Sequence, residues 1–354
     1  MAERRGRIAR MPRTQTALET RPECCNIVLL VDEETGTRLK SGRFVPDRGS
    51  VEAHVLARLT ERYGAVTVVP FTRDVVATIQ ALRDIEPDLV FNLTEWLDGD
   101  RSLDAAITGL LDMLKIPYTG TGPDGMQLAR DKALSKEIVS RLGVDVPRHF
   151  VVNGADRIHD HGLGYPLIVK PQFGDASEAL SASSVVKNAE ELCERVASLR
   201  ERLGAPLICE EFIRGRDLYV ALLGSEPAVM QPVELVVGRK GAAAPRLATY
   251  RLKNDSSYRA RWRVRWKPAI LDTSVALRVE NVSRAIFHAL KLRDYARLDF
   301  RMADDGRVCF LEANPNPDLH PHAMGNHLCF AGLDHGELIR RIVESARART
   351  AAPA

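Results

Sequence analysis

Apolar positions in the first third of the chain follow two alternating periods. Short β-branched runs predict three buried strands, at residues 26–31, 65–70 and 89–93. Between and after them, apolar residues recur every three to four positions, which predicts helices at residues 51–63, 74–84 and 103–114. Strands that alternate with helices form parallel sheets, so we expect a small parallel α/β domain. No Gly-x-Gly-x-x-Gly follows the first strand, so a dinucleotide site is not supported.

The rest of the chain carries the same two patterns. The spacing predicts helices at residues 131–142, 185–203, 272–291 and 333–346, and strands at 165–171, 207–213, 217–224 and 228–237. The stretch 238–267 is strongly basic with little periodicity, and loops of that length are usually functional or disordered. Its last part, 258–267, alternates basic with apolar residues. We favour an edge strand, or a lid over an acidic substrate, for this run; nucleic-acid binding is the alternative.

A hairpin signal near the C-terminus brings acidic and amide side chains together. Between residues 297 and 317, two apolar-rich runs flank an Asp-Asp-Gly sequence typical of a tight turn. Residues two apart on a strand share a face, so Glu312 and Asn314 project together, and Asp299 can lie across from them. Two carboxylates and an amide oxygen are ligands that suit Mg²⁺. The alternative is a set of solvated strand residues, but Arg297 on the same face suits phosphate chemistry.

Composition argues against several classes of protein. The chain has 354 residues, 27% of them charged, and a net charge of +3. Such a small charge argues against nucleic acid or a membrane surface as a partner, and no apolar run is long enough to span a bilayer. The six cysteines form no Cys-x-x-Cys pair, so we expect free thiols and a cytoplasmic protein. Residues 1–22 are expected to be a disordered basic tail, with a functional arm as the alternative.

Two lysines stand where a cation is costly unless an anion lies nearby. Lys170 ends an apolar strand, where burial without a partner is expensive. Lys132 opens a helix whose positive end repels it. A phosphate would offset both costs. The loop after Lys170 would let backbone N–H groups approach phosphate oxygens, because it contains the small residues Gly174, Ala176 and Ser177. Lys136, one turn further along its helix, is expected to be solvated.

Polar residues also follow the third predicted strand. Asn92 and Glu95 lie at its carboxyl end, where ligands gather in parallel α/β sheets, and Gly120 lies in a loop of small residues. We expect Asn92 and Glu95 to lie near a ligand; for Glu95 the alternative is stabilisation of a helix N-terminus. His320 and His322 could suggest zinc, but no third ligand is evident in the sequence.

In combination these features resemble a known family. The sequence Arg297-x-Asp299, a turn, and then Leu-Glu-Ala-Asn-Pro resembles the C-terminal signature of the ATP-grasp superfamily. The stretch 314–319, Asn-Pro-Asn-Pro-Asp-Leu, is most similar to its D-alanine–D-alanine ligase-like branch. The resemblance implies an α/β ATP-grasp fold of three α/β lobes, with a Rossmann-like N-terminal domain and ATP between the central and C-terminal lobes. It divides the chain into a tail 1–22, an N-terminal domain 23–127, a central lobe 128–215, a C-terminal lobe 216–346 and a tail 347–354.

The resemblance also implies a role for each matching residue. The phosphates of ATP would be held by Lys132, Lys170, Gly174, Ala176 and Ser177. The adenosine would be bound by Glu210 at the adenine amino group, by Asp217 at the ribose, and by the backbone of Glu211, Phe212 and Ile213. Mg²⁺, expected as two ions with Mn²⁺ as an alternative, would be bound by Asp299, Glu312 and Asn314. Lys253 would contact the transferred phosphate, and Arg297 the oxygen of the tetrahedral intermediate. Substrate would be bound by Asn92, Glu95, Gly120 and Asn316.

The implied activity is the ATP-dependent joining of a small-molecule carboxylate to an amine. The γ-phosphoryl group would move to the carboxylate, and the amine would attack the resulting acyl phosphate. Two departures from the family pattern point away from D-alanine as substrate. The loop 31–36 does not match Gly-Gly-x-Ser-x-Glu, and Ala323 stands where a serine is usual. A separate departure lies in the phosphate loop, where Ala179 replaces a usual glycine. The alternatives are an ATP-grasp kinase and a nucleotide-binding regulatory module without turnover. The family also implies a homodimer.

Overall fold

The three-stranded parallel sheet that the sequence predicts forms the N-terminal part of the protein. Its strand order is β4-β1-β5, and both strand pairs are parallel. The elements of this part are β1 (Ile27–Asp32), β2 (Gly36–Arg38), β3 (Phe44–Pro46), α1 (Val51–Tyr63), β4 (Val66–Phe71), α2 (Val75–Ile85), β5 (Leu89–Asn92) and α3 (Asp104–Leu114). Ser50 and Asp74 accept backbone N–H groups of α1 and α2, which explains why these helices begin where they do.

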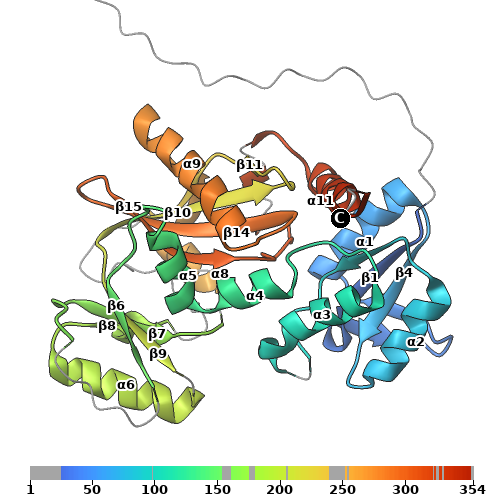
Figure 1. The fold of residues 1–354 in the computed structure, drawn as a ribbon, viewed down its shortest axis with the longest axis horizontal. Helices are drawn as coiled ribbons and strands as arrows, with labels where there is room; N and C mark the ends of the chain where they lie inside the picture. The colour runs from blue at the N-terminus through green and yellow to red at the C-terminus, as the bar shows by residue number, and fades with distance from the viewer. Residues whose placement is uncertain are drawn as a thin grey trace, which may run out of the picture.

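A four-stranded antiparallel sheet follows, in the order β6-β9-β7-β8. Its elements are β6 (His149–Val152), β7 (Leu167–Pro171), β8 (Val185–Val186), α6 (Ala189–Leu203) and β9 (Leu207–Glu211). Leu192, Val196 and Leu199, the apolar stripe of α6, are buried in one cluster with β7 and β9. Figure 1 shows this part at the lower left, in green and yellow-green.

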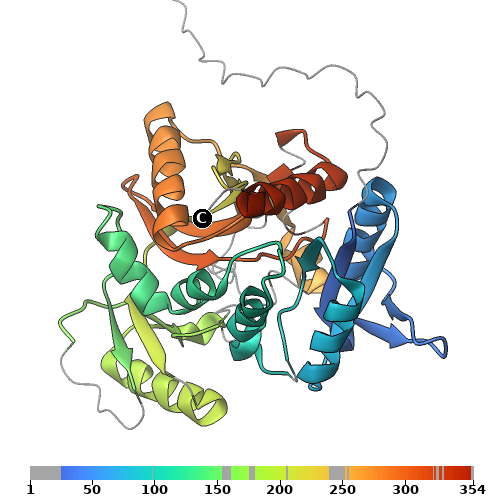
Figure 2. The same ribbon diagram turned by 45° about the vertical axis from the view of Figure 1, so that its right-hand side comes forward.

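The largest sheet is antiparallel, in the order β13-β12-β10-β14-β15, with β11 paired to β10. Its strands are β10 (Gly215–Leu223), β11 (Ala228–Val229), β12 (Val233–Val237), β13 (Val264–Pro268), β14 (Tyr295–Ala303) and β15 (Val308–Asn314). Helix α9 (Thr273–Ala289) packs against the predicted hairpin, since Ile286 and Phe287 share a buried cluster with Phe300 and Phe310. Figure 2 shows α9 as the upright orange helix next to the orange strands of this sheet.

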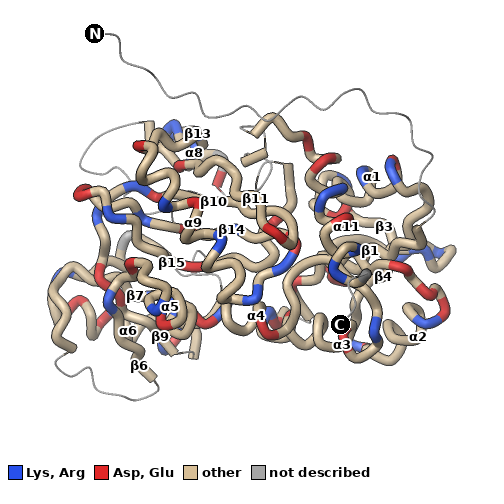
Figure 3. Tube along the Cα trace, turned by 45° about the horizontal axis from the view of Figure 1, so that its top comes forward, with Lys and Arg blue, Asp and Glu red and all other residues tan. Residues whose placement is uncertain are grey.

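The basic run at 258–267 is only partly the edge strand that we expected. Strand β13 does lie at the edge of the large sheet, paired with β12. The edge strand is wrong for 258–262, which belong to helix α8 (Ser256–Trp262), while the alternative of a lid over an acidic substrate stays a prediction. The side chain of Asp255 caps α8, and Arg263, at φ 50°, ends it before the strand begins. Lys and Arg are interspersed with Asp and Glu along the described part of the trace (Figure 3).

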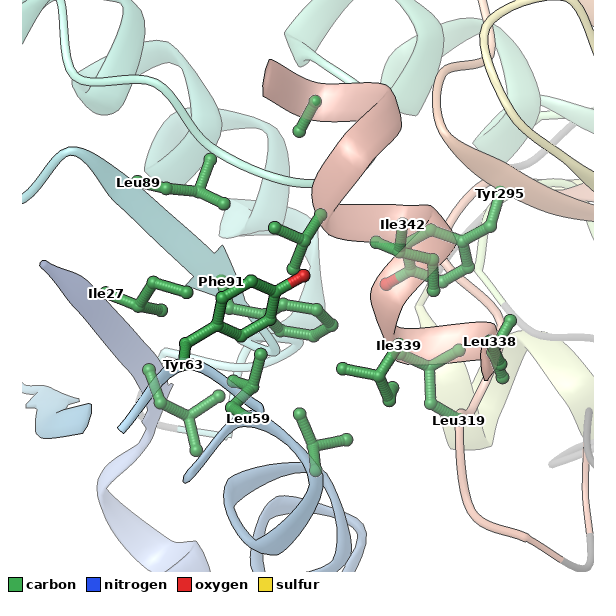
Figure 4. Close-up of a cluster of buried hydrophobic side chains, with 14 of the residues drawn as sticks. Ile27, Leu59, Tyr63, Leu89, Phe91, Tyr295, Leu319, Leu338, Ile339 and Ile342 are labelled. Carbon is green, nitrogen blue, oxygen red and sulfur yellow. The ribbon is translucent and has the colours of Figure 1, made fainter. Parts of the chain in front are cut away.

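The N-terminal and C-terminal parts share a hydrophobic core. Helix α11 (His335–Ala351) returns to pack on α1, and Ile339 and Ile342 of α11 are buried in one cluster with Leu59 and Phe91. Figure 4 shows these side chains pointing toward one another. Helix α11 also runs through residues 347–351, which were expected to be tail. Helices α4 (Pro123–Arg130) and α5 (Lys132–Ser140) cross between the sheets, and Ala129 and Val139 pack in the core of the large sheet.

The computed structural model describes residues 25–97, 99–153, 161–174, 180–204, 206–238, 252, 255–321, 323, 327–328 and 331–351. The predicted tail 1–22 and the candidate residues Ala176, Ser177 and Lys253 lie outside these residues, as does His322.

Gly120 joins the first domain to the large sheet. It has φ +93°, and its N–H donates to Asp294 Oδ2 over 2.8 Å. A Cβ at this position would lie 2.7 Å from Asn316 Oδ1. We expect Gly120→Ala to destabilise the protein by about 3 kcal/mol, because it adds backbone strain and this clash. Gly143→Ala is the control and should cost about 1 kcal/mol, because Gly143 has φ +74° but no atom within 4 Å of an added Cβ. Urea unfolding of both variants checks this, and equal losses would contradict it.

Candidate active site

The predicted hairpin brings the proposed metal ligands together. Asp299 on β14 lies opposite Glu312 on β15, and Arg297 lies opposite Asn314. The Arg297 guanidinium forms a bidentate pair with the Asp299 carboxylate, donating from Nε to Oδ1 over 2.7 Å and from Nη2 to Oδ2 over 3.1 Å. Asn314 Nδ2 lies 3.4 Å from Asp299 Oδ1. The expectation that Asp299 lies across from Glu312 is confirmed.

A β-bulge sets which side chains of β15 face this site. The register shifts after Asp299, so that Phe300 pairs with Phe310 and Leu311 is the extra residue. Glu312 and Asn314 therefore share the face of Asp299, while Phe310 stays in the core, its ring 6.0 Å from that of Phe300. The bulge also frees the carbonyl oxygen of Leu311, which accepts a hydrogen bond from Lys136 Nζ over 2.6 Å.

The ligand set suits a divalent cation. Arg297 donates to both oxygens of Asp299, and Asn314 Nδ2 lies 3.4 Å from Oδ1, so the carboxylate is fixed on the face that it shares with Glu312. Burial opposes the charge on Arg297, but Asp299 outweighs it and raises the pKa of the guanidinium, so Arg297 stays protonated. Asp299, Glu312 and Asn314 could thus hold Mg²⁺, whose remaining positions would be filled by water or phosphate oxygens.

We expected Lys136 to be solvated, but its side chain is fully buried. Its Nζ lies 2.8 Å from Glu210 Oε1, and Lys170 Nζ lies 2.9 Å from Glu210 Oε2. Burial lowers the pKa of Lys136 to about 8, while attraction to Glu210 partly opposes this. The expectation was wrong because the helix turns this lysine toward β9 and β15. The spacing of four from Lys132, which places both on one helix face, was the signal available in the sequence.

Glu210 sits between the two lysines with one oxygen toward each. Burial would raise its pKa, but Lys136 and Lys170 outweigh burial and lower it. For Lys170, attraction to Glu210 and Glu312 outweighs burial and raises the pKa of the ammonium group. Each oxygen of the Glu210 carboxylate is therefore held by one ammonium group, Oε1 by Lys136 and Oε2 by Lys170. Lys132, also buried, donates from Nζ to the carbonyl oxygen of Gly174.

The segment predicted to meet adenosine is fixed by two arginines. Glu211 pairs with Arg148, and Asp217 pairs with Arg301. Arg301 also donates from Nε to the carbonyl oxygen of Ile213 over 3.0 Å, and its guanidinium lies 5.4 Å from the ring centre of Phe212. The sequence analysis did not identify Arg301. Its position two residues after Asp299, on the same strand face, was the available signal.

A cavity of about 710 Å³ connects the metal face with the N-terminal sheet. It is lined by predicted residues of both groups, namely Lys132, Gly174, Arg297, Glu312 and Asn314 from the phosphate and metal set, and Asn92, Glu95 and Asn316 from the substrate set. Gly120 stands behind this wall, since its nearest side chain is that of Asn316. The described structure thus brings together candidates more than 200 positions apart in the sequence.

The carboxyl end of the N-terminal sheet is braced by an acid that sequence reasoning did not identify. Asp32 accepts backbone N–H groups of Glu95 and Trp96, at 3.0 and 3.1 Å to Oδ2. Glu95 pairs with Arg101 across 2.5 Å, and Asn92 Oδ1 accepts from the Thr94 hydroxyl over 2.7 Å. All of these residues line the cavity. The position of Asp32 directly after the first strand was the signal in the sequence.

Asp32 gives the folding stability a pH dependence. Burial raises its pKa to about 6, although the N–H groups of Glu95 and Trp96 oppose this. The protonated Asp32 carboxyl group therefore stabilises the fold. This stabilisation is complete below 3.8, the pKa in the unfolded chain, and is lost as the pH rises through about 6. Between pH 5 and 7.5 we expect wild type to lose about 1 kcal/mol that Asp32→Asn does not lose. Urea unfolding at both values tests this, with exposed Asp84→Asn as control; parallel losses in wild type and Asp32→Asn would contradict it.

Comparison with known proteins assigns this site to a family. A family model described as D-ala D-ala ligase C-terminus matches residues 138–344. The chain belongs to the D-alanine–D-alanine ligase family. A D-alanine–D-alanine ligase of Methylobacterium radiotolerans is 30% identical over 287 residues, which cover 79% of this chain and 87% of that protein. An uncharacterized protein of Sinorhizobium fredii is 28% identical over 309 residues, 85% of this chain and 89% of the relative.

Solved structures of this family share the fold. The D-alanine–D-alanine ligase of Bacillus anthracis complexed with ATP superposes with a TM-score of 0.71 at 19% identity, over 92% of this chain and 98% of that one. VanG D-Ala:D-Ser ligase of Enterococcus faecalis gives 0.64 at 18%, over 91% and 99%. The predicted ATP-grasp fold and family are confirmed, and the chain is an ATP-dependent ligase that forms an amide bond. No helix within the described ranges has the length and apolar character to cross a membrane.

Proposed function

We propose that the cavity is where this ligase phosphorylates a carboxylate and joins it to an amine. One observation carries this proposal: Arg297, Glu312 and Asn314 line the same space as Asn92, Glu95 and Asn316. A cation site, a fixed guanidinium and polar groups of a second domain therefore face one volume. In that volume a carboxylate oxygen could approach the γ-phosphate of ATP, and an amine could then reach the acyl carbon.

We assign the phosphate-binding and metal-binding roles as the resemblance implies. Lys132, Lys170, Gly174, Ala176, Ser177 and Lys253 would surround the phosphates, and bound Mg²⁺ would neutralise their charge. Asp299, Glu312 and Asn314 would hold two Mg²⁺ ions, or Mn²⁺. Arg297, already fixed by Asp299, would stabilise the oxyanion that forms when the amine attacks.

We propose that adenosine lies along residues 210–217. We assign Glu210 to the adenine amino group as the resemblance implies, and its contacts with Lys136 and Lys170 would fix the carboxylate in place. Asp217 would accept from the ribose while Arg301 holds it in place. Glu211, Phe212 and Ile213 would offer backbone groups to the ring edge.

We propose that the substrates are a small carboxylate and an amine other than the D-alanine pair. The named relatives are D-alanine–D-alanine ligases, and one of the solved structures is titled a D-Ala:D-Ser ligase. Ala323 lines the cavity, as do Asp32 and Thr35 in and beside the loop after β1. Both Ala323 and this loop depart from the family pattern. Asn92, Glu95, Gly120 and Asn316 would shape the substrate pocket.

Three further properties remain proposals. We propose a homodimer, as the family implies. We also propose a cytoplasmic location, since the described cysteines Cys193, Cys209 and Cys309 are free thiols. We also propose that the chain divides into an N-terminal domain 23–127, a central lobe 128–215 and a C-terminal lobe 216–346. Light scattering of the purified chain tests the dimer directly.

The function is tested by ADP formation with Mg-ATP across a panel of amino acids and other amines and carboxylates, D-alanine included. We expect ADP, phosphate and an amide product from at least one pair, and none of them without both substrates. Hydroxylamine should trap the acyl phosphate as a hydroxamate. ADP formation with a stable phosphorylated product instead would favour a kinase, and abundant D-alanyl-D-alanine would contradict the altered substrate.

A further inference from the structure

One arginine on the cavity wall has no counter-charge in the described part of the chain. Arg259 is partly buried and lines the cavity, and its side chain forms no ion pair or hydrogen bond with any described residue. The other lysines and arginines of the described lining each hold a protein oxygen: Arg101 one of Glu95, Arg130 one of Asp104, Lys132 the carbonyl oxygen of Gly174, and Arg297 both of Asp299. Among these described cations, Arg259 is thus the one whose N–H groups are available to a molecule in the cavity.

Arg259 comes from the edge of the large sheet that lies opposite the metal ligands. It belongs to α8, which leads directly into β13 and packs beside that strand (Figure 3). Strands β13 and β15 are the two ends of the order β13-β12-β10-β14-β15. Four strand spacings of about 4.8 Å therefore separate β13 from β15, which carries Glu312 and Asn314. An anion at Arg259 is therefore expected to be a different group from the phosphates beside the proposed metal ligands.

Two aromatic rings link Arg297 with the strand that follows α8. The Arg297 guanidinium lies 5.5 Å from the ring centre of Tyr219, and that ring lies 4.9 Å from the ring of Trp266 on β13, centre to centre. Both rings line the cavity. They offer mainly apolar surface, so a substrate that lies along them would have a hydrocarbon body. A charged group at the far end of that body would come toward α8.

We infer that Arg259 selects a substrate whose side chain ends in a carboxylate. The inference rests on the proposed ligase function and deepens it: one substrate carries an acidic group in addition to the carboxylate and the amine that are joined. A guanidinium can donate two parallel hydrogen bonds to a carboxylate, and water and salt screen a partly buried pair less than an exposed one. Arg259 would set specificity and take no part in phosphoryl transfer. The basic run 258–267, for which an acidic substrate was one prediction, thereby gains a defined residue and a defined chemical group.

Binding of matched acids and amides tests the inference without turnover. Isothermal titration calorimetry of the full chain with Mg-ADP compares D- and L-glutamate and D- and L-aspartate with glutamine and asparagine of the same hand. The members of each pair differ in the charge of the side chain and share the α-carboxylate and the amine. At least one acid should bind about 10- to 100-fold more tightly than its amide, the usual gain for a hydrogen bond to a charged group. Acids that bind no better than their amides would overturn the inference.

Three variants assign the preference to one side chain. Arg259→Gln should reduce the ratio of acid to amide affinity to less than about threefold, and Arg259→Glu should reverse it. Arg261→Gln should keep the wild-type ratio, because Arg261 lies exposed on the same helix and outside the described lining of the cavity. The affinity for Mg-ATP should stay within about threefold in all of them. An unchanged ratio in Arg259→Gln would overturn the inference, as would an equal loss of Mg-ATP affinity, which would make Arg259 a phosphate ligand.

The inference and the ligase proposal fail in different ways. A preference for the acid that disappears in Arg259→Gln supports the inference whether or not ADP forms. A protein that shows this preference but forms no ADP with any pair of substrates counts against the ligase proposal alone. ADP formation, together with equal binding of acids and amides, counts against the inference alone.

Discussion

Glu312→Gln is expected to lower the rate of ADP formation by at least about 100-fold. The substitution keeps the shape of the side chain but removes one of the two carboxylates that lie opposite each other at Asp299 and Glu312. A bound metal ion contributes several kcal/mol to phosphoryl transfer, and Mg²⁺ binds poorly to an amide in place of a carboxylate. Steady-state ADP release at saturating ATP measures the effect. Raising Mg²⁺ should recover part of the rate if the ligand has weakened metal binding.

The matched control for Glu312→Gln is Asp305→Asn on the same hairpin. Asp305 lies exposed at the turn, where it pairs only with Arg307 among the described contacts. It should therefore keep wild-type activity and nearly wild-type stability. Circular dichroism of both variants should show intact folds. If Glu312→Gln stayed as active as Asp305→Asn, the metal assignment of β15 would be wrong.

Lys136→Met is expected to cost about 3 kcal/mol of folding stability and to weaken ATP binding. Its ammonium group is buried between the Glu210 carboxylate and the carbonyl oxygen of Leu311. Removing one partner of a buried ion pair leaves charge uncompensated, which is strongly destabilising. Glu210 would then be neutralised by Lys170 alone, and this lysine would be less available to phosphate. Urea unfolding gives the stability change, and titration with Mg-ATP gives the affinity.

Two further variants make the Lys136 prediction specific. Lys187→Met removes an exposed lysine before α6 and should change neither quantity by more than about 0.5 kcal/mol. The double variant Lys136→Met, Glu210→Gln should bind Mg-ATP more tightly than Lys136→Met alone, because the amide oxygen can still accept from adenine while Lys170 is released from the charge of Glu210. Equal affinities in the single and double variants would show that the two lysines do not compete through Glu210.

The local elements could be predicted because their causes are local. Strands β1, β4 and β5 are short apolar runs, and α1 begins at a serine cap, so periodicity and capping place them within a residue or two. The hairpin of β14 and β15 was predicted for the same reason. Alternation along two strands joined by a tight turn was sufficient to place Asp299 opposite Glu312.

The partners of the buried charges could not be predicted from local patterns. Lys136 was expected in solvent because nothing near it in sequence shows that β9 and β15 enclose it. The bulge at Leu311, which frees the carbonyl oxygen for that lysine, depends on how two strands fit and leaves no mark in composition. Asp32 and Arg301 were missed likewise, because their partners come from distant segments.

The most direct test of the account follows an oxygen atom. The ligase is incubated with Mg-ATP, its amine substrate and its carboxylate substrate labelled with ¹⁸O in both carboxyl oxygens, and the released phosphate is analysed by mass spectrometry. Phosphorylation of the carboxylate followed by amine attack predicts one ¹⁸O in each inorganic phosphate and none in ADP. Phosphate free of ¹⁸O, with the amide still formed, would contradict an acyl phosphate and with it the central claim.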